Sequence, residues 1–499
     1  MSYCEQCGQK LTPGMRFCEA CGAHVPDTGA IHGEMPAEVL EKGLVVTDVS
    51  ALAEQLEVAA DRVRSVVVSF CRSARARGVE YELCDLGSAA QDVGDASLPF
   101  LRTVVERRSP KYLFILGNEE IVDVVRWENG AEDSDEIVES DLCYAALDVM
   151  SPWEGVRYDV EDLLRVGRLP TYDGEPFAEF AGYFARLAAQ AGRLEPLMPY
   201  GLSAFVWQEE SDSLFSRISP NRVDVSPMIT CATVSPRMAY RPNLLYFNLH
   251  GSDRAAYWYG QSGSSYPEAF SPELMARIER PFFAATEACY GAKYQDGLTP
   301  EGSALLAAMT GQCLSFLGSS RIAYGTCRPQ GSCADLVVGE FIRLVQVGWS
   351  AGDAYVEGLA RLCANGRMDD SDVKTLAEFA LYGDPSVRMT GGTSAKASPK
   401  AKPALRRTGL AMPDVRLAVR MALSACNARI EQTVDELVRR QNADWFGGKS
   451  VAAFRQKTFR LQGLGLNQKM YWTDDGAFVR ALKVYFDDFG TIRKTVESK

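Results

Sequence analysis

The chain has 499 residues, a formal net charge of −12 and 46% hydrophobic residues. This length is too great for a single core, so about three to four domains are expected. The acidic balance argues against general nucleic-acid binding, because no net basic field is available to displace counterions from a phosphate backbone. No apolar segment approaches the roughly 18 residues that a membrane-spanning helix needs, which argues against membrane insertion.

The first 24 residues predict a zinc ribbon. Two Cys-x-x-Cys-Gly turns, separated by ten residues, contain the candidate ligands Cys4, Cys7, Cys18 and Cys21. Four thiolates close a tetrahedral Zn²⁺ site without an open position, so we expect about one structural zinc ion per chain. The alternative, two redox-active cysteine pairs, lacks the surrounding βαβ pattern. A ribbon this small has almost no apolar core, so the metal is expected to supply its folding energy. Its expected role is docking or regulation through a protein partner.

Residues 25–40, which contain Pro, Gly and Asp, predict a linker. The chain has 14 cysteines in total, and its N-terminus has no apolar segment of the kind found in a signal peptide. Reduced thiols together with a metal site then predict a cytoplasmic protein.

Residues 41–195 alternate strand and helix patterns, which predicts an α/β subdomain built on a parallel sheet. Strands are expected at residues 44–47, 79–84 and 112–116, and helices at residues 51–77, 98–107 and 176–190. The acidic run at residues 128–139 predicts a solvated loop.

Residues 196–389 predict a second subdomain, organised around the apolar runs 243–252 (NLLYFNLHGS) and 281–292 (PFFAATEACYGA). Runs of this length suit strands that are buried on both faces of a parallel sheet. Because catalytic groups lie beyond the carboxyl ends of such strands, the two runs are expected to deliver His250 and Cys289 to one sheet edge.

A thiolate nucleophile with an imidazole that activates it is the combination that thiol catalysis requires. The chain has three histidines, and the other two, His24 and His32, lie in the N-terminal segment. A histidine that acts in the main body is therefore His250. Taken singly, each residue is more often a buried structural side chain, but their joint position at two strand ends favours catalysis.

Residues 390–412 form a Gly/Ser/Ala/Pro/Lys-rich stretch that predicts a flexible linker. Residues 413–499 predict a small α+β accessory domain, with a helix at 413–442 and strands within 451–460 and 468–494. Its Trp445 and Trp472 mark either a binding face or, more commonly, core packing.

The two strand ends, LHGS and TEACYGA, resemble the His-Gly and Ala-Cys strand ends of the caspase-like cysteine peptidases, and the gingipain family most of all. Three further segments resemble the family in its order: YLFILGN at 112–118, FLGSSRIAYG at 316–325 and LYGDPSVRM at 381–389. The resemblance implies a caspase-like parallel sheet sandwiched by helices in two subdomains. Two features depart from it, because Leu249 replaces the usual Gly and the run Thr-Glu-Ala before Cys289 is closer to the legumain branch.

The resemblance also implies an endopeptidase with a Cys289–His250 dyad and an oxyanion hole made by the amides of Gly251 and Cys289. It places Asp212 and Glu287 in the primary substrate pocket. Two carboxylates in one partly desolvated pocket favour a bound cation, so cleavage after Arg or Lys is expected. Alternatively, Asp212 caps the following helix and Glu287 faces solvent.

A rival interpretation from another class is a protease-derived binding scaffold that keeps the fold without turnover. Leu249 and the two accessory modules favour that interpretation, whereas the intact His-Gly and Ala-Cys pair opposes it. The expected partners are a protein or peptide substrate and a protein bound by the zinc ribbon or the C-terminal domain. Neither a nucleic acid nor a membrane is expected.

Overall fold

The structure is a computed structural model. It describes residues 2–3, 10–11, 40–87, 97–146, 152–154, 163–190, 197–326, 331–364, 368–389, 420–422, 428–461, 464–474 and 479–499. Contacts divide the chain into two units, Met1–Glu41 and Lys42–Lys499. In the first unit, β1 (Ser2–Tyr3) pairs antiparallel with β2 (Lys10–Leu11). The four predicted zinc ligands and the predicted linkers 25–39 and 390–412 lie outside the described residues.

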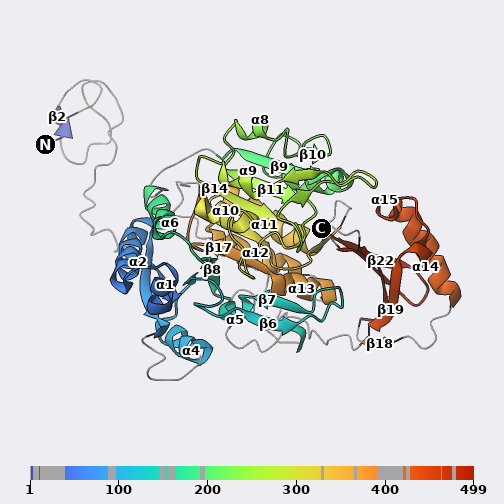
Figure 1. Ribbon diagram of the computed structural model, residues 1–499, viewed down its shortest axis with the longest axis horizontal. Helices are drawn as coiled ribbons and strands as arrows, with labels where there is room; N and C mark the ends of the chain where they lie inside the picture. Colours follow the sequence, from blue (N-terminus) through green and yellow to red (C-terminus); the bar gives the residue numbers. More distant parts are fainter. Residues whose placement is uncertain are drawn as a thin grey trace. The chain divides into compact units, whose positions relative to one another are not determined.

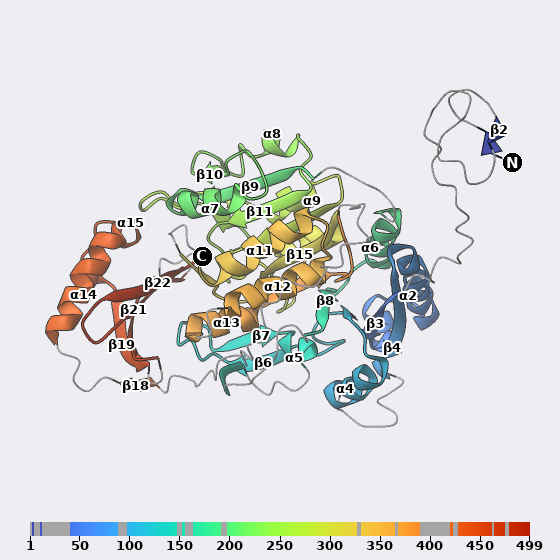
Figure 2. The same ribbon diagram turned by 180° about the vertical axis from the view of Figure 1, so that it is seen from behind.

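The second unit is built on a ten-stranded sheet of order β10-β9-β11-β14-β15-β17-β8-β5-β3-β4, flanked by helices (Figures 1 and 2). Its strands are β3 (Glu41–Thr47), β4 (Val79–Asp85), β5 (Tyr112–Leu116), β8 (Arg165–Leu169), β9 (Pro199–Ala204), β10 (Asp224–Ser226), β11 (Leu244–Asn248), β14 (Phe282–Thr286), β15 (Cys313–Ser319) and β17 (Phe379–Gly383). Strand β17 is antiparallel to β15, whereas β11 is parallel to both β9 and β14. The mixed but mostly parallel sheet confirms the predicted α/β fold class.

Complete burial explains the apolar sequences of the central strands. Every residue of β5, β11 and β14 is buried, which is typical of strands covered on both faces. Helices α11 (Ala334–Gln346) and α12 (Ala351–Cys363) pack on this sheet, α11 against β11 and β14 and α12 against β8 and β17. Strands of both predicted subdomains therefore belong to one sheet.

The remaining helices of this part of the chain surround the sheet or connect its strands. They are α1 (Val49–Gln55), α2 (Ala60–Ala74), η1 (Arg75–Arg77), α4 (Ser97–Arg108), α5 (Leu142–Ala145), η2 (Pro152–Glu154), α6 (Phe177–Gln190), η4 (Phe205–Trp207), α7 (Gln208–Phe215), α8 (Ser235–Met238), α9 (Pro272–Ala276), α10 (Ala304–Thr310) and α13 (Asp370–Glu378). The helix predicted at 51–77 is divided into α1, α2 and η1, because the chain turns at Glu57, which has a φ of 52°.

The acidic run at 128–139 forms structure that the sequence did not predict. Strands β6 (Val125–Glu128) and β7 (Ile137–Ser140) pair antiparallel, and the segment between them turns inward. The buried ammonium group of Lys374 on α13 lies 2.7 Å from Asp133 and 2.6 Å from Asp135. The prediction of a solvated loop is therefore wrong, because a cation distant in the sequence compensates the two carboxylates.

The C-terminal domain is a six-stranded antiparallel sheet of order β16-β22-β21-β20-β19-β18. Its strands are β16 (Tyr324–Gly325), β18 (Arg420–Ala422), β19 (Arg455–Leu461), β20 (Leu466–Asp474), β21 (Val479–Phe486) and β22 (Ile492–Ser498); its helices are α14 (Ala428–Gln441), α15 (Ala443–Phe446) and η5 (Val451–Ala453). The first of these strands, β16, comes from the predicted region 196–389, so its pairing with β22 joins two regions of the sequence. Residues 420–422, predicted as helix, form strand β18.

Trp445 is buried in the core of this domain with Phe446 and Phe454, which favours core packing over a binding face for that tryptophan. A separate antiparallel pair, β12 (Trp258–Tyr259) and β13 (Glu268–Phe270), follows the His250 strand. Among the described residues, no helix has both the length and the apolar character to cross a membrane.

Candidate active site

The parallel strands β11 and β14 bring His250 and Cys289 to the same sheet edge. Phe247 of β11 is in register with Thr286 of β14, and each candidate residue follows its strand by two or three positions. Gly251 makes the approach of the two strand ends possible, because a Cβ at this position would lie 1.7 Å from the carbonyl oxygen of Cys289. No other residue type has space here.

The imidazole of His250 is held by Gln261, which the sequence did not indicate. Nε2 of His250 lies 2.7 Å from Oε1 of Gln261, while the Gln261 amide nitrogen donates to the carbonyl oxygen of Gly263 at 3.0 Å. The second bond fixes which amide atom faces the ring, so Nε2 carries the proton and Nδ1 is the basic nitrogen of the neutral imidazole. Trp207 and Tyr266 pack against the ring, with centroid distances of 4.4 and 5.5 Å.

Burial determines the charge state of both candidate catalytic groups. It lowers the pKa of His250 to about 3, although the bond that Nε2 donates to Gln261 acts in the opposite direction. It also raises the pKa of the Cys289 thiol far above its ordinary value, and the carboxylate of Glu378 adds to that increase. A neutral imidazole and a neutral thiol are therefore the stable forms in this structure.

The backbone amides of Gly251 and Cys289 converge on one oxygen atom. Both donate to the main-chain oxygen of Lys499, at N···O distances of 3.4 and 3.2 Å respectively. The amide of Lys499 in turn donates to the carbonyl oxygen of Ala323 at 3.0 Å, and the Cys289 thiol contacts the same carbonyl at 3.5 Å. The predicted oxyanion amides thus surround a main-chain oxygen that belongs to the chain itself.

Strand β22 enters this site along β16. Ser498 pairs with Tyr324 and Glu497 pairs with Gly325 in an antiparallel ladder. Figures 1 and 2 both show β22 running from the C-terminal sheet toward the ten-stranded sheet, where the C-terminus lies. An extended segment added to an exposed strand is a common mode of peptide recognition.

The side chain of Lys499 fills a closed acidic pocket. Its Nζ lies 3.2 Å from Oδ1 of Asp335 and 3.4 Å from Oε2 of Glu287, and none of these three side chains is exposed. The ammonium group also lies 4.3 Å from the centre of the Trp207 ring and donates to the carbonyl oxygen of Thr326 at 3.4 Å. The pocket therefore offers charge, a ring face and a backbone acceptor to one cation.

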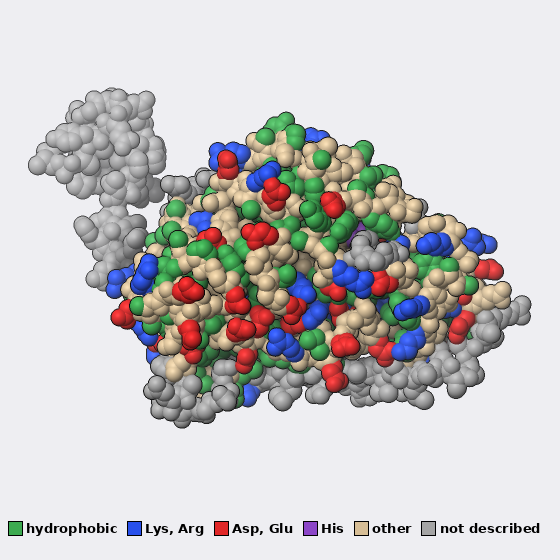
Figure 3. Space-filling model, viewed as in Figure 1, with side chains coloured by type: hydrophobic (Ala, Val, Ile, Leu, Met, Phe, Trp, Pro, Cys, Tyr) green, Lys and Arg blue, Asp and Glu red, His purple; other side chains and the backbone are tan. Residues whose placement is uncertain are grey.

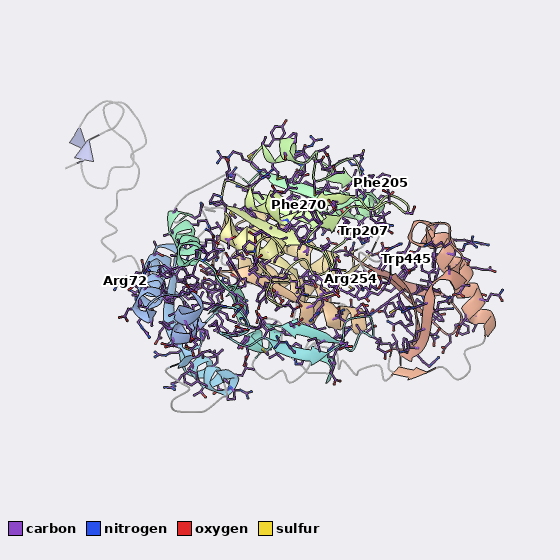
Figure 4. The ribbon with its side chains drawn as sticks, in the orientation of Figure 1. Arg72, Phe205, Trp207, Arg254, Phe270 and Trp445 are labelled. Atoms are coloured by element: carbon purple, nitrogen blue, oxygen red, sulfur yellow. The ribbon has the colours of Figure 1, made fainter. Side chains whose placement is uncertain are left out.

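Two features give the pocket its shape. Gly325 forms part of its wall, because a Cβ there would lie 2.1 Å from Cε of Lys499. Trp207, labelled in Figure 4, lies on the side of the ten-stranded sheet that faces the C-terminal sheet, and its indole nitrogen donates to Glu497 of β22.

Both pocket carboxylates are fixed by neighbouring donors. Oε1 of Glu287 accepts a bond from the Tyr246 hydroxyl at 2.7 Å, and Oδ2 of Asp335 accepts from the amides of Thr326 and Ser332 at 2.8 and 2.9 Å. Burial raises the pKa of Glu287 well above its ordinary value, Asp335 raises it further, and Lys499 opposes both effects. Because Glu287 is completely buried, the alternative in which it faces solvent is excluded.

Asp212 is not brought to this pocket by any contact that the structure shows. Its Oδ1 accepts from the amide of Val223 at 3.0 Å, and its Oδ2 accepts from Nε of Arg222 at 2.7 Å. The acid of α7 that interacts with the pocket is Glu210. Burial raises the pKa of Glu210 to about 7, and the negative charge of Asp335 adds to the increase. Glu210 is on the buried face of α7 and Asp212 is not, so the structure shows no contact that supports the predicted place of Asp212 in the pocket.

A cavity of about 380 Å³ adjoins Cys289. Its lining includes Gly251, Arg254, Tyr290 and, from the C-terminal domain, Val479. Arg254 binds Asp474 of that domain through two bonds of 2.9 and 3.0 Å. Figure 3 shows acidic and basic side chains interspersed over the face that it displays.

Within the described ranges, no group of three or more His, Cys, Asp or Glu side chains is arranged to hold a metal ion. The cysteines of the N-terminal turns fall outside those ranges, so their geometry adds nothing to the sequence argument.

Comparisons with known proteins find likenesses for the N-terminal ribbon and for the fold of the chain. A zinc-ribbon domain family model matches residues 3–25. The comparison with curated proteins finds no match. Among solved structures, the Arg-specific cysteine proteinase gingipain R is similar over 93% of this chain and 98% of its own, with a TM-score of 0.50 and 10% identity. The chain has the fold of gingipain R.

A second solved structure, described as a protease, covers 92% of this chain and 97% of its own, with a TM-score of 0.46 and 11% identity. At 10% identity, the likeness to gingipain R concerns the fold. The chemistry must therefore be argued from the residues of this chain.

Proposed function

We propose that the chain is a cysteine endopeptidase in which Cys289 is the nucleophile and His250 is the general base. The observation that carries the proposal is the convergence of the Gly251 and Cys289 amides on one main-chain oxygen, that of Lys499. Two preorganised N–H donors at that position stabilise the negative oxygen of a tetrahedral intermediate. The fold shared with gingipain R supports the same interpretation.

We propose the following chemical steps from the chemistry of these groups. The Cys289 thiol transfers its proton to Nδ1 of His250, and the sulfur attacks the scissile carbonyl carbon. The carbonyl oxygen becomes negatively charged between the two amides, and the imidazolium then protonates the leaving amine to give a thioester. Water, deprotonated by His250, hydrolyses that thioester and restores the thiol. Gln261 is a positioning residue, because its bond to Nε2 holds the imidazole with Nδ1 as the basic atom.

We further propose that the residue before the cleaved bond is basic, with lysine preferred. Support comes from the pocket that receives the Lys499 side chain, where Asp335 and Glu287 lie within 3.4 Å of its ammonium group. Arginine is the longer cation, and the completely buried lysine already reaches both carboxylates. The earlier expectation of Arg or Lys is retained, but Asp335 replaces Asp212 as the second acid.

The zinc ribbon is proposed to bind one Zn²⁺ through Cys4, Cys7, Cys18 and Cys21. A set of four thiolates in two Cys-x-x-Cys turns fits tetrahedral zinc, and the zinc-ribbon match at residues 3–25 supports it. We expect metal analysis of the purified protein to give about one zinc ion per chain. Deletion of residues 1–24 should remove the metal and leave peptidase activity unchanged, and zinc that survives the deletion contradicts the assignment. A cytoplasmic location is part of the same proposal.

The test of peptidase function is a cleavage profile on a peptide library. We expect cleavage after lysine by the full chain, and more by the chain lacking residues 497–499. Cys289→Ala and His250→Ala should abolish cleavage, whereas Cys71→Ala, which changes a half-buried cysteine of α2, should not. The rival binding scaffold predicts no turnover in any of these proteins. Cleavage that persists in Cys289→Ala would show that another group is the nucleophile.

A further inference from the structure

The backbone of residues 497–499 makes the contacts that a bound peptide substrate requires. The ladder with β16 aligns the segment, and the amide of Lys499 donates to the carbonyl oxygen of Ala323 at 3.0 Å. The main-chain oxygen of Lys499 then accepts from the Gly251 and Cys289 amides. These contacts define the register, because Lys499 stands where the residue before the cleaved bond would stand.

The side chains agree with this register. Lys499 fills the pocket made by Asp335, Glu287 and the Trp207 ring, and it is completely buried. Glu497 is bound by the indole nitrogen of Trp207. The segment therefore uses the primary pocket and a second contact, which a random surface strand would not do.

The C-terminal domain is anchored next to the site by charged pairs with the start of α13. Lys494 of β22 lies 2.5 Å from Asp369 and 2.9 Å from Asp372. Lys483 of β21 lies 2.9 Å from Asp370 and also donates to the carbonyl oxygen of Ala131 at 2.8 Å. All these lysines and acids come from separate regions of the sequence, so their pairing fixes the domain beside the cleft.

We propose that residues 497–499 occupy the substrate cleft of their own chain as a substrate-like inhibitor, with Lys499 in the primary pocket. The proposal rests on the proposed peptidase function, since it names the ligand of the same site. Occupancy leaves Cys289 only 3% exposed and excludes peptide substrates from β16. Activation then requires that the segment leave the cleft while the catalytic sheet stays intact.

Tethering explains why three residues suffice. A ligand held beside its site by the same chain has an effective concentration on the order of millimolar. A peptide substrate at micromolar concentration competes poorly against it. Removal of the tripeptide should therefore raise apparent kcat/KM at low substrate concentration by at least about tenfold.

The proposal is tested by binding of a labelled peptide, a readout that needs no turnover. The probe is fluorescein-labelled Thr-Val-Glu-Ser-Lys, the sequence of residues 495–499, and its control ends in alanine. Anisotropy is measured with the wild type, Lys499→Ala, the chain lacking residues 497–499, and Arg493→Ala. Arg493 lies on β22 outside the tripeptide and pairs with Asp487 of its own domain, so its change leaves the cleft occupied.

We expect the shortened chain and Lys499→Ala to bind the lysine probe at micromolar concentration, and the wild type and Arg493→Ala not to bind it. The alanine probe should bind none of them. In the same proteins, iodoacetamide should modify Cys289 at least about tenfold faster when the tripeptide is absent. Equal binding of the lysine probe by the wild type and the shortened chain overturns the proposal. It is also overturned if the shortened chain is folded but does not bind the lysine probe.

The two proposals fail in different ways. If the shortened chain binds the lysine probe but cleaves no peptide, the peptidase assignment is wrong, whereas the proposal that residues 497–499 occupy the cleft is supported. If the wild type cleaves lysine substrates as fast as the shortened chain and binds the probe equally, the peptidase stands and the inhibitor fails. Thermal unfolding of each variant shows whether its fold is retained.

Discussion

Nζ of Lys499 lies 3.2 Å from Oδ1 of Asp335, and neither side chain is exposed to solvent. With Glu287 at 3.4 Å, the pocket contains two carboxylates and one cation. An empty pocket would leave like charges facing each other away from water, which is costly unless one of them is protonated. The site is therefore built to be occupied by a cation, and its chemistry gives the first prediction.

Asp335→Asn should reduce kcat/KM for lysine substrates by about 100-fold in the chain lacking residues 497–499. Loss of one partner of a buried charge pair costs about 2–5 kcal/mol. The amide oxygen of Asn still accepts the bonds from the Thr326 and Ser332 amides, so the loop should keep its shape. Asp212→Asn is the matched control, because Asp212 binds Arg222 instead. A similar loss in both variants would show that the pocket assignment is wrong.

Gly251→Ala should reduce kcat by at least about 100-fold, the usual effect of removing one oxyanion donor. The added Cβ would lie 1.7 Å from the Cys289 carbonyl oxygen, so the two strand ends must separate. Gly182→Ala is the control, because a Cβ there meets no atom closer than 3.5 Å, on Arg186. Steady-state kinetics on a lysine peptide would check both variants, and an active Gly251→Ala protein would contradict the oxyanion assignment.

Lys374→Met should lower the free energy of unfolding by about 3–5 kcal/mol, because it leaves Asp133 and Asp135 buried without their cation. Denaturant titration measures the change. The control is Lys457→Ala, since Lys457 is about half exposed and its pair with Glu132 should contribute no more than about 1 kcal/mol. An equal decrease in the free energy of unfolding for the two variants would show that Asp133 and Asp135 are exposed to solvent.

The acid stability of the protein should depend on His250. Its pKa is lowered to about 3 by burial, whereas the unfolded chain has an ordinary histidine. Between these two pKa values the unfolded state binds a proton that the folded state does not, so stability falls as the pH falls. The contribution is about 1.4 kcal/mol per pH unit from pH ~6.5 down toward pH ~3.

Denaturant titration at pH 6.5 and 4.5 would measure this dependence in the wild type and in His250→Asn. In the variant, the change in the free energy of unfolding with pH should be smaller by about 1.4 kcal/mol per pH unit, whatever the absolute stability of the variant. Identical slopes would show that His250 is protonated in the folded protein.

The elements that the sequence predicted well are those whose residues alone determine burial. Strand β5 has the predicted bounds, and β11 and β14 lie within the predicted apolar runs, because continuous apolar residues are stable only between two covered faces. The positions of His250 and Cys289 at one sheet edge followed from the same pattern. The structure brings those strand ends together as expected.

The features that the sequence missed depend on residues far apart in the chain. The acids at 133 and 135 looked solvated because their cation, Lys374, is more than 200 residues away. Asp335 carried no local signal beyond its place in the first turn of α11. Gln261 follows the His250 strand after a loop whose path the sequence does not reveal, and Lys499 reaches the cleft only through strand pairing.

Strand β22 is bonded along both edges, to β21 on one side and to β16 on the other. If the C-terminal domain departs as a unit, β22 remains on β21 and its other edge becomes an unpaired margin with Lys499 at its tip. Such a margin is a template for pairing with another chain. A detached domain on one molecule would then fit the vacated cleft of a second molecule. At high protein concentration, this exchange of domains between molecules would inhibit the peptidase again.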